Sequence, residues 1–277
     1  MMTVQSLKLE GRVAIVTGAA QGIGRSIVQK LANEGAQVIA NDLDADLLAE
    51  SVDKLTEQGM TAHALPGDIT EQATTEALVS TALERYGDLH IVVNNAGYIW
   101  NSAAVKHTDE QWQAMLDVHA TGPFRLLREA GHHFRQQAST ESPDRLRKIV
   151  NVSSISGIYG AATQVAYSSA KAAVVGMTKT LAREWGRYHV TVNCVAFGYI
   201  DTRLIESFED QPNRVRIKNR DHPVGLTAAQ RESAKEMAAL GRLGRPEDAA
   251  NAVYLLCIPE SDFITGEVLV ASGGLMN

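Results

Sequence analysis

The sequence has little cysteine, no long apolar run and no excess of positive charge. Its two cysteines, Cys194 and Cys257, are too few for a disulfide framework or a zinc-ligand pattern and fit a reducing compartment. No stretch reaches the roughly 18 apolar residues of a membrane span, and the first residues contain no signal-peptide core. The net charge of −6 gives no electrostatic footprint for nucleic acid. We therefore expect a cytoplasmic protein without a membrane or nucleic-acid partner.

What the sequence does have is a regular alternation of strand-like and helix-like segments. Short β-branched runs predict strands at 12–17, 36–41, 61–65, 89–94, 148–153, 190–196 and 266–271. Longer segments predict helices at about 22–34, 45–58, 71–86, 109–137, 164–186 and 246–257. The strands are apolar almost throughout, as in parallel sheets buried on both faces. The pattern predicts an α/β fold, with residues 1–277 forming a single domain.

Two segments interrupt this alternation. Residues 137–147 are polar and contain Pro143, which predicts an exposed loop. Residues 199–240 are long, charged and poorly periodic, and segments of this kind in compact domains are usually functional. We expect residues 199–240 to form a mobile cover over a substrate.

The first predicted strand runs directly into the glycine-rich sequence TGAAQGIG, residues 17–24. Gly18, Gly22 and Gly24 lie where a helix begins, so backbone amides and the helix N-terminus could bind a pyrophosphate. A tight strand–helix turn is the alternative reason for these glycines. Asp42 follows the second strand, where a carboxylate can accept hydrogen bonds from a ribose and repel a 2′-phosphate. Asp42 therefore favours NAD over NADP, although it could instead cap the next helix.

A helix near the middle of the chain carries the candidate catalytic groups. Tyr167 and Lys171 are four residues apart and share a helical face. A lysine ammonium close to a tyrosine would lower its pKa from about 10 and make it a general acid/base. Ser154 ends the fifth strand, at the sheet edge where ligands bind, and its hydroxyl could hold a carbonyl oxygen.

Together, TGAAQGIG, NNAG (94–97), Ser154 and YSSAK (167–171) resemble the classical short-chain dehydrogenase/reductase family over about residue 8 to the C-terminus. The resemblance implies a Rossmann fold with seven parallel strands and helices on both faces, assembled as a homotetramer or dimer. It also implies hydride transfer between a nicotinamide and an alcohol or carbonyl carbon. Tyr167 would be the acid/base, Ser154 would hold the substrate oxygen, and Lys171 would bind the nicotinamide ribose and lower the tyrosine pKa.

Further roles follow from the resemblance alone. The residues that would contact the cofactor are Gly18, Gln21, Gly22, Ile23, Gly24, Asp42, Asp68, Ile69, Asn95, Ala96, Gly97, Tyr167, Lys171, Gly198, Ile200 and Thr202. Asn94 would stabilise the central strands. Trp100, Tyr159 and Phe208 fall where family members line the substrate pocket, although two of the three could equally pack beneath the 199–240 segment.

The sequence departs from the family pattern at two positions. Phe197 precedes Gly198 where the family has proline, which frees the backbone at a bend beside the nicotinamide. His119 stands where the family has an asparagine that supports a relay water, and Gly122 confirms the alignment. We place His119 with the catalytic residues, its carbonyl supporting the relay. An imidazole near its usual pKa of about 6.5 would make that relay sensitive to pH.

These observations lead to one main hypothesis and several alternatives. The chain is predicted to be an NAD-dependent oxidoreductase interconverting a secondary alcohol and a ketone, and among relatives it resembles 3-oxoacyl-(acyl-carrier-protein) reductases and 3-hydroxyacyl dehydrogenases. The substrate would be a small alcohol or ketone, including an acyl thioester; a sugar, polyol or cyclic alcohol is the alternative.

The basic run at 214–220 fits an acidic substrate group or a solvated surface. No histidine pair has metal-ligand spacing, so we expect no metal. An NAD-binding sensor or scaffold is the non-enzymatic alternative.

Overall fold

The computed structural model describes residues 7–140, 142, 145–209, 213–217 and 220–275, without the side chains of 213–217 and 220. One seven-stranded parallel sheet forms its centre, in the order β11-β6-β5-β4-β1-β2-β3. The strands are β1 (Val13–Thr17), β2 (Gln37–Asp42), β3 (Ala62–Pro66), β4 (Ile91–Asn94), β5 (Arg147–Ser154), β6 (Val190–Phe197) and β11 (Val268–Ala271). All seven correspond to strands predicted from the sequence. The predicted α/β Rossmann-type fold is confirmed.

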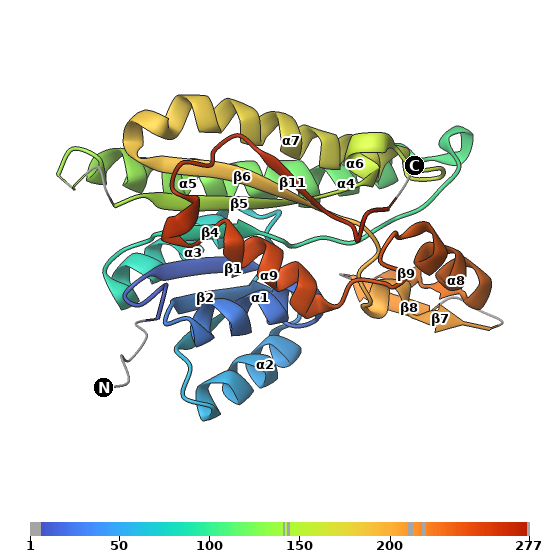
Figure 1. The fold of residues 1–277 in the computed structure, drawn as a ribbon, viewed down its shortest axis with the longest axis horizontal. Coiled ribbons are helices and arrows are strands. Elements are labelled where there is room, and N and C mark those ends of the chain that lie inside the picture. The colour runs from blue at the N-terminus through green and yellow to red at the C-terminus, as the bar shows by residue number, and fades with distance from the viewer. Residues whose placement is uncertain (1–6, 141, 143–144, 210–212, 218–219, 276–277) are drawn as a thin grey trace.

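Helices cover both faces of the sheet (Figure 1). Helices α1 (Gly22–Asn33), α2 (Ala45–Glu57) and α9 (Pro246–Leu255) pack on one face, and α3 (Gln72–Tyr86), α4 (Asp109–Leu116), α5 (Gly122–Gln137) and α7 (Val165–Trp185) pack on the other. Alternate residues of β1 serve the two cores: Ala14 and Val16 belong to the first, and Val13 and Ile15 to the second. Burial on both faces explains why the central strands are apolar at nearly every position.

The single helix predicted at 109–137 is wrong, because a π-helical turn, η2 (Asp117–Thr121), separates α4 from α5. Pro123 has no N–H to donate to the carbonyl of His119 four residues earlier. Here the backbone hydrogen bonds span five residues instead of four, and the N–H of Gly122 donates to the carbonyl of Asp117. His119 therefore lies in the middle of an irregular turn, a feature frequently found at functional sites.

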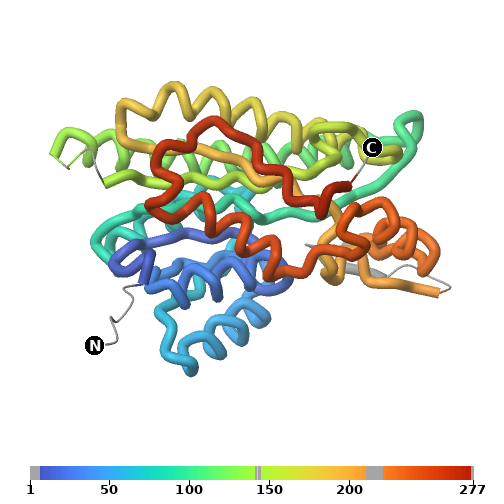
Figure 2. The backbone as a smooth tube through the Cα atoms, viewed as in Figure 1, coloured from blue at the N-terminus to red at the C-terminus, as the bar shows by residue number. Residues whose placement is uncertain are grey.

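The segment after β6 forms a small lobe beside the carboxyl end of the sheet. It contains η4 (Arg203–Ile205), the paired two-residue strands β7 (Ser207–Phe208) and β10 (Leu226–Thr227), the hairpin of β8 (Asn213–Ile217) and β9 (Arg220–Val224), and α8 (Ala228–Met237). Figure 2 follows the backbone out from β6, through this lobe and back into α9. Helix α8 begins with a capping box between Thr227 and Gln230, a local signal that the weak periodicity concealed.

The predicted loop at 137–147 is corrected at its end. Strand β5 begins at Arg147, whose side chain is 1% exposed and bonds to Asp88 and to the carbonyl of Leu89. A buried arginine is tolerated where its charge is paired, and composition alone does not show that pairing. Pro143 lies outside the described residues.

Among the described helices, none is both long and apolar enough to cross a membrane. Both cysteines are buried free thiols.

Candidate active site

The glycine loop joins β1 to α1 with backbone packing that excludes side chains. A Cβ atom on Gly24 would lie 1.8 Å from the carbonyl oxygen of Gly18, and one on Gly18 would lie 2.7 Å from Cα of Ala96. The cap residue Gln21 makes no side-chain cap hydrogen bond, and the first turn of α1 contains no acidic residue. The first amides of α1 are thus left for an anionic ligand, and the loop fits the pyrophosphate of a dinucleotide.

The side chains of Thr17, the last residue of β1, and Asn95, directly after β4, hold this loop in place. Asn95 donates from Nδ2 to the carbonyls of Thr17 and Gly18, at 2.9 and 3.1 Å. The Thr17 hydroxyl oxygen accepts from the amides of Asn95 and Ala96, both at 3.1 Å. Asn95 therefore shapes the loop from below, and Thr17 is an organising residue that the sequence analysis missed. Asn94 bonds to Asn151 at 2.8 Å across β4 and β5, which confirms its predicted role in the central strands.

Asp42, at the end of β2, faces the same cavity as the loop. One carboxylate oxygen accepts from the amide of Ala20 at 3.0 Å, and the other accepts from the amide of Asp44 at 3.1 Å. Asp44, and not Asp42, caps α2 by accepting from the amide of Leu47. The alternative role of Asp42 as the cap is therefore excluded, and its carboxylate is oriented at the loop.

The next loop brings Asp68 and Ile69 to the same cavity. Asp68 accepts hydrogen bonds from the amide and the hydroxyl of Thr70, at 2.9 and 2.7 Å. Asn41 supports this loop by donating to the carbonyls of Leu65 and Gly67. This function of Asn41 was not predicted, although a polar residue next to Asp42 in an apolar strand was a signal.

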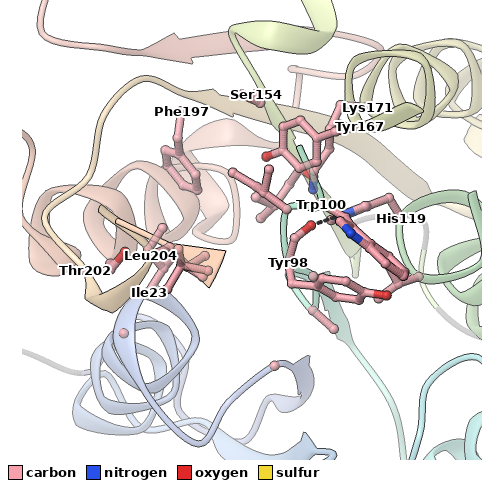
Figure 3. Close-up of a pocket in the computed structure, with 18 of the residues that line it drawn as sticks. Ile23, Tyr98, Trp100, His119, Ser154, Tyr167, Lys171, Phe197, Thr202 and Leu204 are labelled. Carbon is pink, nitrogen blue, oxygen red and sulfur yellow. Dashed lines mark hydrogen bonds between the residues drawn. The ribbon is translucent and has the colours of Figure 1, made fainter. Parts of the chain in front are cut away.

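Ser154 and Tyr167 meet at the carboxyl end of β5 (Figure 3). The Ser154 oxygen accepts from the amide of Ser156 at 3.1 Å, and the Ser154 hydroxyl lies close enough to the Tyr167 phenol to affect its pKa. Burial of the phenol raises the pKa of Tyr167 to about 12, although the neighbouring Ser154 hydroxyl acts to lower it. The pair can therefore present two hydroxyl protons to one substrate oxygen.

The predicted lowering of the Tyr167 pKa by Lys171 is wrong for this geometry. The two residues share a face of α7, but Nζ of Lys171 donates to the carbonyl of Val152 at 2.7 Å and lies 5.8 Å from the centre of the Tyr167 ring. Burial also lowers the pKa of Lys171 to about 8. Helical spacing placed both groups correctly, whereas desolvation, which depends on the whole fold, decided their pKa values.

His119 is buried beside Tyr167, with their ring centres 5.0 Å apart in an edge-to-face arrangement. Its Nε2 lies 2.7 Å from the carbonyl oxygen of Tyr98, so Nε2 carries the proton that it donates. Burial, together with the Lys171 ammonium, holds the pKa of His119 well below 6.5. The predicted pH sensitivity near 6.5 is therefore wrong, because the imidazole is neutral there.

The remaining predicted positions also border the cavity. Phe197 ends β6 and pairs with β5, its carbonyl accepting from the amide of Ile155 at 3.0 Å. Gly198 packs closely on Ser272, where a Cβ would lie 2.9 Å from its Cα. Ile200 is buried and pairs with Gly244, and Thr202 lies against the glycine loop at Gly22.

One cavity of about 1690 Å³ runs from the glycine loop to α7 and continues under the lobe. Its lining includes Trp100, Tyr159 and Phe208, the three residues expected at the substrate pocket. His222 from β9 also lines it and was not predicted, because nothing in the sequence shows that the hairpin folds back. The basic side chains of its described lining are Lys171 and Arg203.

The basic run at 214–220 has its side chains outside the described part of the structure. In the portion of the chain that is described, no group of three or more His, Cys, Asp and Glu side chains is arranged to hold a metal ion.

Comparison with known proteins gives a consistent result. A family model described as enoyl-(acyl carrier protein) reductase matches residues 18–276. The chain is 34% identical to the 3-oxoacyl-[acyl-carrier-protein] reductase FabG of Thermotoga maritima, covering 98% of this chain and 100% of that protein. It is 32% identical to the (2S)-[(R)-hydroxy(phenyl)methyl]succinyl-CoA dehydrogenase subunit BbsD of Thauera aromatica, over 96% and 97% of the two chains. It is 33% identical to FabG of Vibrio cholerae, over 97% and 99%.

Proposed function

Because this chain belongs to the short-chain dehydrogenase/reductase family and is an oxidoreductase acting on CH–OH or ketone groups, we propose that it interconverts a secondary alcohol and a ketone with NAD. The observation that carries the proposal is the Ser154–Tyr167 pair, which lines the same cavity as the glycine loop. Lys171 lies on the same helical face as Tyr167.

In the reducing direction, a side chain of the protein donates the proton. With its pKa raised to about 12, Tyr167 is protonated at neutral pH and donates that proton to the substrate oxygen. The Ser154 hydroxyl donates a second hydrogen bond to the same oxygen and stabilises its developing negative charge. When bound, the nicotinamide supplies a hydride from C4 to the carbonyl carbon. Ketone, hydride and proton together give the secondary alcohol.

The cofactor would lie along the cavity, with its pyrophosphate on the amides of α1 and its adenosine ribose at Asp42. Lys171 would bind the nicotinamide ribose, and the remaining contacts would come from Gln21, Ile23, Asp68, Ile69, Asn95, Ala96, Gly97, Gly198, Ile200 and Thr202. Asp42 supports NAD over NADP, because its carboxylate would repel a 2′-phosphate.

For the substrate, the names of the FabG relatives favour a ketone located two carbons from an acyl thioester. The name of the Thauera aromatica relative adds a phenyl group beside the reacting carbon. We further propose a cytoplasmic homotetramer or dimer. Leu269 and Val270 support an assembled form, because they leave apolar surface exposed on the edge strand β11.

The proposal is tested by mixing the purified protein with NADH and a panel of ketones, and repeating the assay with Tyr167→Phe. We expect turnover that falls by about 10²–10⁴-fold in the variant, the range for loss of a general acid. Undiminished turnover in Tyr167→Phe would refute the mechanism. Tight NADH binding without turnover of any ketone would instead indicate a sensor.

A further inference from the structure

Three aromatic rings from separate parts of the chain form one wall of the cavity. The ring of His222, on β9, lies 4.6 Å from the ring of Trp100 at an interplanar angle of 87° and 5.0 Å from the ring of Tyr98. All three residues line the cavity, and His222 is 3% exposed. We call Tyr98, Trp100 and His222 the ring wall. Because its members come from β9 and from the segment after β4, the wall exists only when the lobe is folded against the sheet.

Within the lobe, close backbone packing fixes the path of the chain. Gly225 follows β9 with a φ of +108°, and a Cβ on it would lie 2.6 Å from the carbonyl of Glu206 and 2.9 Å from the ring of Phe208. The parallel pairing of β7 with β10 lies directly beside this contact. Strand β9 therefore leaves the hairpin at a fixed point, which sets His222 over the cavity and adds Phe208 to its lining.

The ring wall is connected to Tyr167 through His119. The carbonyl of Tyr98 accepts from Nε2 of His119, and the His119 ring meets the ring of Tyr167 edge-on. Figure 3 shows Tyr98, Trp100 and His119 on one side of the cavity and Phe197 and Leu204 on the other, with Tyr167 above the space between them. A substrate whose oxygen lies at Tyr167 therefore has the wall on one side of the space open to its remaining atoms.

The chemistry of the wall indicates what those atoms are. Aromatic faces and edges favour another flat ring, stacked or edge-to-face, over a flexible alkyl chain, which loses more rotational freedom when it is bound. Tyr159 and Phe208 add aromatic surface to the same cavity. We propose that the ring wall selects ketones that carry a planar ring directly on the carbonyl carbon.

This inference rests on the proposed ketone reduction and is tested with two 3-oxo esters that differ only at that carbon. Ethyl benzoylacetate carries a phenyl ring, and ethyl acetoacetate carries a methyl group. With NADH, we expect kcat/KM at least about tenfold higher for the phenyl ester, a difference of about 1.4 kcal/mol. In the Trp100→Ala and His222→Ala variants, the ratio of kcat/KM for the phenyl ester to that for the methyl ester should fall to within about threefold, mainly because KM for the phenyl ester rises. His222→Phe, which restores a ring, should keep the preference, and Val105→Ala, 95% exposed and outside the cavity lining, should keep it as well.

A binding measurement separates this inference from the reaction itself. Saturation-transfer NMR on Tyr167→Phe protein with NADH compares acetophenone with 2-butanone, which lacks a ring. We expect strong transfer to the ring protons of acetophenone that is lost in the additional Trp100→Ala and His222→Ala variants. Equal kcat/KM for the two esters, a wall variant that lowers both equally, or ring binding that survives both alanine variants would overturn the inference. If neither ester is reduced, the binding result alone decides it, and the Tyr167→Phe comparison separately decides the proposed function.

Discussion

Nε2 of His119 lies 2.7 Å from the carbonyl oxygen of Tyr98, and this contact fixes the tautomer of the ring next to Tyr167. A carbonyl only accepts, so Nε2 holds the proton and Nδ1 holds the lone pair. Nδ1 is buried and has no hydrogen-bond partner within the described structure. The imidazole is thus a neutral, anchored ring and not a titrating group at neutral pH, because its pKa lies well below 6.5.

Substitutions of His119 should therefore have graded effects. We expect His119→Asn to keep most of the activity, because an amide can still donate toward the Tyr98 carbonyl. His119→Ala should lose less than about 10²-fold, below the loss in Tyr167→Phe, if the relay depends on the backbone carbonyl at 119. Steady-state assays of the three variants check this order, and His119→Ala as inactive as Tyr167→Phe would show that the imidazole itself transfers the proton. The wild-type rate should show no inflection near pH 6.5.

Gly97 should be essential because of His119. A Cβ at position 97 would lie 2.2 Å from Cε1 and 2.7 Å from Nδ1 of the imidazole. We expect Gly97→Ala to reduce kcat/KM by more than about tenfold, because the ring must leave its position beside Tyr167. The double variant Gly97→Ala/His119→Ala should recover part of that loss, which a double-mutant cycle measures. Gly186→Ala, where a Cβ meets nothing within 4 Å, is the matched control. Additive losses in the cycle would argue against this coupling.

Asp42 should determine the choice between NADH and NADPH. Asp42→Asn retains an acceptor oxygen for the amide of Ala20 or Asp44 but removes the negative charge. We expect the ratio of the two dissociation constants to shift toward NADPH by about tenfold or more, since charge repulsion with the 2′-phosphate is lost. Fluorescence titration with both cofactors measures this ratio, and Asp53→Asn, on the exposed side of α2, is the control. Equal affinity of the wild type for both cofactors would refute the role of Asp42.

The buried ammonium of Lys171 should make stability depend on pH. Burial lowers its pKa from 10.5 to about 8, so between these values the unfolded chain binds more protons than the native chain. The free energy of unfolding should therefore rise from pH 8 toward pH 9, by at most about 1.4 kcal/mol per pH unit. The raised pKa values of the buried thiols Cys194 and Cys257 act in the opposite direction above pH 9, and that of Tyr167 does so above pH 10. Urea denaturation at several pH values measures the slope, and Lys171→Met should remove this contribution. A slope that persists in Lys171→Met must come from other groups.

By itself, the sequence determined the seven-stranded sheet, the main helices and the positions of Ser154, Tyr167 and Lys171, because these depend on local signals. Apolar runs mark buried strands, and glycines mark the tight β1–α1 junction. Residues four apart in a helix share a face whatever surrounds them.

Only the tertiary structure decided the properties that depend on distant neighbours. Desolvation raised the pKa of Tyr167 and lowered the pKa of His119. The sequence had instead suggested a lowered pKa for the tyrosine and an unshifted pKa for the histidine. The partner of His119 is a carbonyl 21 residues away, and the partners of His222 lie more than one hundred residues away. No local pattern encodes such contacts, because folding brings together side chains that the chain itself keeps far apart.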